Sequence, residues 1–109
     1  MSPESLLAGQ LERALFRLAG AAGGVAAVME DTGMRGSMGS DDLCPVALWL
    51  AAHLDTEVHV GCGRARARER RVWVEATLPA GVSDFVAGFD NGIYPQLVSP
   101  FLPDAGDDD

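Results

Sequence analysis

Two runs of alternating apolar and polar residues decide the fold: Glu57-Val58-His59-Val60 and Val72-Trp73-Val74-Glu75-Ala76-Thr77. Because successive side chains of a strand point to opposite faces, this period of two predicts a half-buried strand in each run. The arginine-dense octet of residues 64–71 lies between the two runs and joins them. The sequence therefore predicts a β-hairpin, formed by residues from about 57 to 62 and from about 71 to 78, with one face against a core.

Two glycines influence how the arginine octet is oriented. Gly61 and Gly63 are unusual inside a strand and favour a β-bulge at this point. A bulge exchanges inward and outward positions, which turns the alanines of the octet toward the core and its alternating arginines toward solvent. These residues are Ala65 and Ala67 on one face and Arg64, Arg66 and Arg68 on the other. In the alternative, the octet is a mobile loop.

Apolar residues at helical spacing predict three helices that pack on this hairpin. The first helix runs from about residue 3 to residue 19. The second begins after Asp41 or Asp42, either of which suits an N-cap, and contains the apolar residues 46–54. The third contains residues 82–89, where apolar side chains recur at three- and four-residue intervals.

The segment between the first two helices is less regular. Residues 25–29 fit either a short strand or another helical turn. Residues 30–40 are rich in glycine, serine and methionine, which predicts a mobile linker. Because a two-stranded hairpin is marginal alone, helices must cover it or another strand must extend it. That strand would come from residues 25–29 or from a second subunit, so we expect self-association.

One small α+β domain accounts for the chain, because 109 residues are too few for two independent cores. The predicted order is α-linker-α-β-β-α. Residues 1–40 hold the first helix and the glycine-rich linker. Residues 41–99 form an α-β-β-α core, in which the hairpin packs against two to three helices. Residues 100–109 are predicted to be an acidic disordered tail, since four aspartates, two prolines and a glycine cannot build a core.

Charge is distributed unevenly along the chain. The net charge is −8, but residues 64–71 hold five arginines and one glutamate, a net +4, which leaves −12 on the remaining residues. An acidic body disfavours attraction to nucleic acid or to an anionic membrane. No basic n-region precedes an apolar run near the start, and no apolar run reaches the roughly 20 residues of a membrane span. We therefore expect a cytoplasmic protein without membrane contact.

Every histidine and cysteine falls within a short stretch of the chain. The four residues are Cys44, His53, His59 and Cys62. Two thiolates and two imidazoles would satisfy tetrahedral zinc, but the closely spaced cysteine pair of zinc motifs is absent. In addition, Cys44 and His53 fall near opposite ends of one predicted helix, roughly 13 Å apart. We therefore predict no metal and no cofactor, with zinc or thiol chemistry, or a disulfide between the two cysteines, as alternatives.

No catalytic motif stands out. The segment Arg35-Gly36-Ser37-Met38-Gly39 lacks the first glycine of the hydrolase motif G-x-S-x-G, and the glycine-rich nucleotide-binding motifs are absent. We therefore expect the protein not to be an enzyme.

The arginine octet and two neighbouring aromatic residues are the best candidates for a binding surface. The candidate residues are Arg64, Arg66, Arg68, Arg70, Arg71, His59 and Trp73. The leading hypothesis is a non-enzymatic protein–protein interaction module that binds a protein partner or itself through this face. A nucleic-acid accessory protein, with the arginines on phosphates and Trp73 stacked on bases, is the alternative. A third interpretation is a solvated face that protects a sheet edge.

Overall fold

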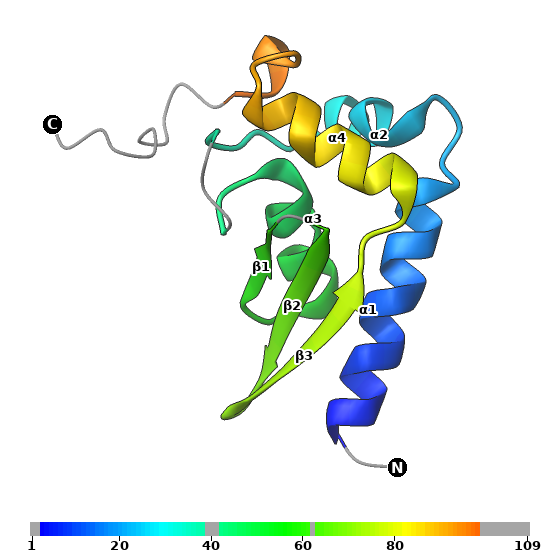
Figure 1. Ribbon diagram of the computed structural model, residues 1–109, viewed down its shortest axis with the longest axis vertical. Coiled ribbons are helices and arrows are strands. Elements are labelled where there is room, and N and C mark those ends of the chain that lie inside the picture. The colour runs from blue at the N-terminus through cyan, green and yellow to red at the C-terminus, as the bar shows by residue number, and fades with distance from the viewer. Residues whose placement is uncertain (1–2, 39–41, 62, 99–109) are drawn as a thin grey trace, which may run out of the picture.

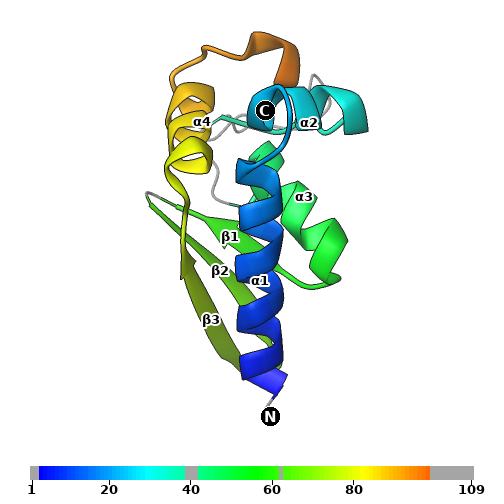
Figure 2. The ribbon, with the colours of Figure 1, turned by 90° about the vertical axis from the view of Figure 1, so that its right-hand side faces the viewer.

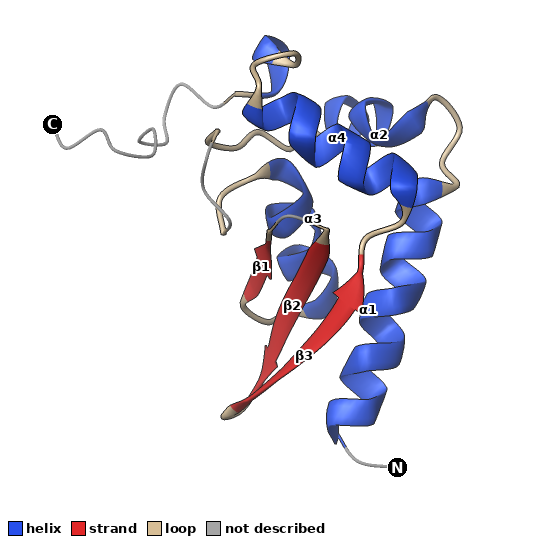
Figure 3. Cartoon of the chain, in the orientation of Figure 1, coloured by secondary structure: helices blue, strands red, loops and turns tan. Residues whose placement is uncertain are grey.

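Three antiparallel strands form a meander in the order β1-β2-β3, with β1 at Val58–Val60, β2 at Arg64–Glu69 and β3 at Val72–Thr77. The computed structural model describes residues 3–38, 42–61 and 63–98 (Figure 1); for residues 3–5 it describes the backbone only. The strands and four helices form one domain (Figure 3), which confirms the predicted α+β class but has one helix more than the two to three expected.

The arginine octet supplies a strand of its own, and this corrects the predicted two-stranded hairpin. The first strand ends at Val60 rather than near residue 62. Gly61 and Gly63 belong to the connection between β1 and β2, where Gly63 has a φ of 80° and the Gly61 N–H donates to the Arg64 carbonyl at 2.9 Å. The glycines therefore mark a tight turn between two strands instead of a bulge within one.

The predicted orientation of the octet is confirmed. Ala65 and Ala67 are 0% exposed, whereas Arg64, Arg66 and Arg68 are exposed. In register, Ala67 lies between Val58 of β1 and Val74 of β3, both buried. The sheet thus has one apolar inner face and one polar outer face.

Four helices complete the domain: α1 at Pro3–Ala19, α2 at Gly24–Thr32, α3 at Pro45–Leu54 and α4 at Ala80–Asp90, followed by the short 3₁₀ helix η1 at Pro95–Leu97. The first has the predicted bounds. Figure 2 shows α1 and α3 on the same side of the sheet, while α2 and α4 lie beyond one end of it. The small alanines of β2 allow α1 to approach the sheet closely, and α1 contacts both β2 and β3. The core is drawn from all of these elements, and its fully buried side chains include Leu11, Leu15, Leu18, Met29, Val46, Leu50, Val82, Phe89 and Leu97.

Residues 25–29 are helical, which settles the open choice between strand and helix. Gly23 and Gly24 adopt left-handed φ values of 82° and 88° and turn the chain out of α1 into α2. Val25 and Met29, four residues apart, are buried on the face that packs against the rest of the core. In a helix this spacing is about one turn, so both side chains lie on the same face.

The predicted linker is wrong for the residues that the structure describes within it. Thr32 is the last residue of α2, and Ser37 is 0% exposed. The Gly36 N–H donates to the Leu97 carbonyl at 2.9 Å, and Gly36 forms a parallel bridge with Val98. This backbone pairing orders a segment whose composition is typical of a linker. Residues 39–41, like the predicted tail at 100–109, lie outside the described residues.

The start of α3 also differs from the prediction. Cys44 is the N-cap, and its sulfur accepts a hydrogen bond from the Ala47 N–H at 3.4 Å. Pro45 follows at the first helical position, where its fixed φ suits the helix and its missing N–H costs nothing. Asp42 lies before the cap, and Asp41 lies outside the described residues.

Candidate functional site

The side of the sheet opposite α1 and α3 carries a row of polar and aromatic side chains. We call this the outer sheet face. It consists of Glu57 just before β1, His59 of β1, Arg64, Arg66 and Arg68 of β2, and Trp73, Glu75 and Thr77 of β3. Among the described residues no helix packs on it (Figures 1 and 2). Its side chains are therefore available to a partner.

Trp73 is the centre of a cluster of cations and aromatic rings. The guanidinium carbons of Arg66 and Arg68 lie 5.4 and 6.0 Å from the ring centroid of Trp73. The His59 ring meets the Trp73 ring edge-on, with centroids 5.3 Å apart. Such contacts hold the side chains in place, although each contributes only about 0.5–1 kcal/mol at an exposed site. Because Trp73 is still 37% exposed, the cluster presents an ordered surface to solvent.

Two carboxylates pair with some of these cations. Glu57 Oε2 lies 2.8 Å from His59 Nε2, and Glu57 Oε1 accepts a hydrogen bond from Arg68 at 3.4 Å. Glu75 accepts one from Arg64, also at 3.4 Å. The hydrogen bond from His59, and to a smaller extent that from Arg68, lowers the pKa of Glu57 below its usual value. Glu57 is therefore ionised at neutral pH and orients His59 and Arg68.

Three arginines of the octet have no such partner. Arg66, Arg70 and Arg71 have no carboxylate within 4.0 Å in the described part of the chain. Arg66 stands in the middle of the outer sheet face, opposite His59 in β1 and Glu75 in β3. Arg70 and Arg71 form the turn between β2 and β3, where Arg70 has a left-handed φ of 59°. The structure thus brings His59, Arg66 and Trp73 together, and it leaves the two turn arginines at the tip of the sheet.

The candidate metal ligands do not converge in the described residues. Cys44 is buried at the start of α3, and His53 lies in the last turn of the same helix. His59 lies on the outer sheet face, across the sheet from α3. Cys62 lies outside the described residues, so the zinc and disulfide alternatives that involve it remain predictions. No group of three or more possible metal-binding side chains occurs within residues 3–38, 42–61 and 63–98.

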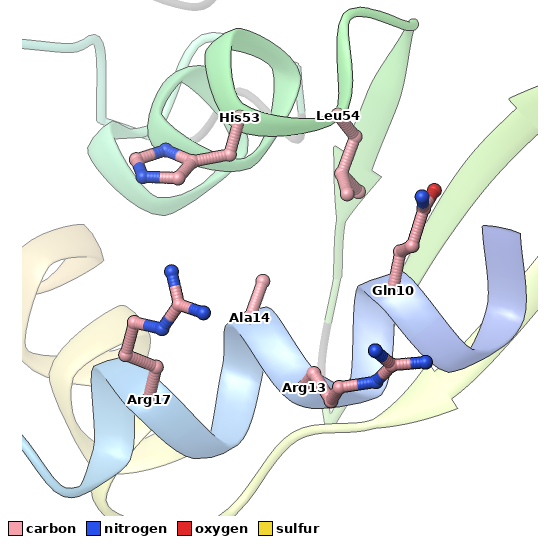
Figure 4. A pocket seen from close by; sticks show the side chains of 6 residues that line it. All are labelled: Gln10, Arg13, Ala14, Arg17, His53 and Leu54. Atoms are coloured by element: carbon pink, nitrogen blue, oxygen red, sulfur yellow. The ribbon is translucent and has the colours of Figure 1, made fainter.

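Two surface pockets are lined by residues that, apart from His53, the sequence does not single out. One, of about 250 Å³, lies between α1 and α3 (Figure 4), and its lining consists of Gln10, Arg13, Ala14, Arg17, His53 and Leu54. The other, of about 280 Å³, lies between α1 and the end of β3, and its lining consists of Glu12, Leu15, Phe16, Thr77, Leu78 and Pro79. The four-residue spacing of Arg13 and Arg17 indicates that both lie on one face of a helix. That α3 packs opposite this face cannot be inferred from the spacing.

Comparison with known proteins adds no assignment: no family model, no curated protein and no solved structure matches the chain. Within the described residues, no helix has the length and apolar character needed to cross a bilayer.

Proposed function

We propose that the protein is a non-enzymatic interaction module that binds an acidic protein surface through the outer sheet face. The observation that carries this proposal is the cluster of Arg66, Arg68 and His59 around a partly exposed Trp73, on a face that no described helix covers. Tryptophan and arginine are the residues that most often dominate binding energy at protein interfaces. Their contacts with one another hold them in place before a partner arrives, which lowers the entropy lost on binding.

Arg66 is the anchor for a carboxylate of the partner. Within the described residues it has no carboxylate partner, whereas its neighbours Arg64 and Arg68 each pair with a glutamate of the same face. A guanidinium binds a carboxylate with two parallel hydrogen bonds, which gives both strength and orientation. The partner therefore places an aspartate or glutamate over Arg66 and an apolar group over Trp73.

The charge of the chain favours a protein over a nucleic acid as the partner. The octet carries +4 against −12 on the rest of the chain, so a long polyanion that contacts the octet is repelled by the body of the protein. A protein with a local acidic patch avoids most of this repulsion. A second copy of the chain, whose body is itself acidic, belongs to this class of partner.

Native mass spectrometry of the chain purified from its own cells tests the proposal, because it reports a retained partner or a second copy directly. The affinity for that partner is then measured by calorimetry for the wild type and for Trp73→Ala and Arg66→Ala. Each substitution should weaken binding by about tenfold or more, which corresponds to about 1.4 kcal/mol. The loss for Arg66→Ala should shrink at high salt.

Arg35→Ala is the matched control, because Arg35 lies outside the sheet and donates to the Met34 carbonyl next to it. It should bind the partner as the wild type does. Equal affinity of the wild type and both outer-face variants would contradict the proposal. Retardation of single-stranded nucleic acid at low salt that Trp73→Ala abolishes would move the function to the nucleic-acid class.

A further inference from the structure

The pocket between α1 and α3 is lined by two arginines of α1 and by the last two residues of α3. Gln10, Arg13, Ala14 and Arg17 follow one another at intervals of three, one and three residues, which places them on one face of α1. His53 and Leu54, the last two residues of α3, form the opposite wall. Figure 4 shows the Arg17 guanidinium rising from α1 toward the side of the pocket that His53 occupies.

His53 is held in place by its own helix. Its Nδ1 lies 3.0 Å from the Trp49 carbonyl oxygen, and its ring stacks on Trp49 with centroids 3.9 Å apart. A carbonyl oxygen can only accept, so Nδ1 carries the proton and donates. Nε2 is then the ring nitrogen left to interact with a ligand. Ala14, buried and small, leaves the space between the helices open.

The two arginines of the pocket are not neutralised. Neither Arg13 nor Arg17 has a carboxylate within 4.0 Å among the described residues, although the chain has twice as many acidic as basic residues. Asp55, the C-cap of α3 and the carboxylate next in sequence to the pocket wall, makes no ion pair with either one. The carbonyl end of α3 adds about half a negative charge, which two full positive charges outweigh. The pocket therefore favours an anion.

We infer that this pocket binds a phosphate group, either as inorganic phosphate or as the head of a small phosphomonoester. The guanidinium groups of Arg13 and Arg17 and the Gln10 amide supply many donors and few acceptors, which matches a tetrahedral dianion better than a planar carboxylate. A volume of about 250 Å³ limits the ligand to a phosphate with a few carbon atoms, and Ala14 and Leu54 provide apolar walls for those atoms. The site is separate from the outer sheet face and independent of the function proposed for it.

Nuclear magnetic resonance titration of the full chain with inorganic phosphate tests the inference. The ring signals of His53 and the Nε–H signals of Arg13 and Arg17 should shift together and saturate. A titration with glycerol phosphate should reach saturation at equal or lower concentration, and acetate should produce no saturating shift. Vesicles of phosphatidylcholine with and without phosphatidic acid separate a free ligand from a lipid headgroup: co-sedimentation only with phosphatidic acid, lost in Arg17→Ala, would identify the lipid as the source of the phosphate.

Substitutions at the pocket separate this site from the arginines of the sheet. Arg17→Ala and Arg13→Ala should each weaken phosphate binding about tenfold. Arg17→Lys should recover part of the loss, because lysine restores the positive charge but not the paired N–H donors of the guanidinium. These side chains are exposed, so thermal unfolding of the variants should match that of the wild type. Arg66→Ala is the control and should bind phosphate normally. A phosphate-induced shift that fails to saturate, that survives Arg17→Ala, or that Arg66→Ala abolishes would overturn the inference.

Discussion

Replacing Ala67 by leucine tests the division of the sheet into two faces. Ala67 is fully buried between Val58 and Val74 and under α1, so three additional carbon atoms have no space without displacing the helix or a neighbouring strand. Overpacking of this kind costs about 1–3 kcal/mol. For a domain of this size, each kcal/mol lowers the melting temperature by about 4–8 °C. Circular dichroism during urea and thermal unfolding measures both quantities.

Arg66→Leu is the matched control, because it introduces the same side chain one residue earlier on the opposite face. There the leucine points to solvent, and the free energy of unfolding should change by no more than about 1 kcal/mol, the contribution of the lost contact with Trp73. The reasoning would be refuted if Arg66→Leu destabilised the protein as much as Ala67→Leu, or if Ala67→Leu were neutral. Either result would mean that the octet does not form an alternating central strand.

Two further substitutions probe other parts of the structure. Gly36→Ala should destabilise strongly, because a Cβ there would collide with the Leu43 carbonyl oxygen and lie 2.8 Å from Pro45. Gly81→Ala is the control: its Cβ meets open space in the first turn of α4, and the change should stabilise the protein by up to about 1 kcal/mol. Chemical denaturation of both variants measures the two changes in the free energy of unfolding. Glu57→Gln should reduce stability at neutral pH but not in acid: the pKa of Glu57 is lowered in the folded state, so its contribution is present above the usual value of 4.5 and is lost as the pH falls through the folded value. Urea unfolding of wild type and variant from about pH 7 to pH 3 should show the two curves converging; a constant difference would contradict the assigned hydrogen bonds.

The sequence predicts the elements that have a strong period. The first helix and β3 follow from regular spacing, and the burial of Ala65 and Ala67 follows from alternation with the arginines. A separate strand at β2 is not predicted because its residues, arginine, alanine and glutamate, are not typical of strands, and pairing with β1 and β3 on its two sides stabilises it.

Elements stabilised by distant parts of the chain escaped prediction. Gly23 and Gly24, both with left-handed φ, lie at the start of α2 and are typical of a chain break, but Met29 is buried in the core and stabilises the helix there. The order of residues 34–38 depends on Leu97 and Val98, which no local pattern reveals.

The candidate sites differ in the same way: contacts within the sheet follow from local pattern, and contacts between helices do not. His59 and Trp73 were predicted to share a face because strand parity is a local property. Arg17 and His53 belong to different helices, and their proximity depends on how α1 packs against α3. Such pairs are specified by tertiary packing alone.

The pairing of Gly36 with Val98 also affects the order in which the chain folds during synthesis. Gln96 donates to Glu30 at 3.0 Å across 66 residues, and Leu97 accepts from Gly36. Until residues 95–98 have been made, these contacts cannot form, and a long loop must close before they do. The pairing of neighbouring strands such as β2 and β3 requires no such loop, so it can begin earlier.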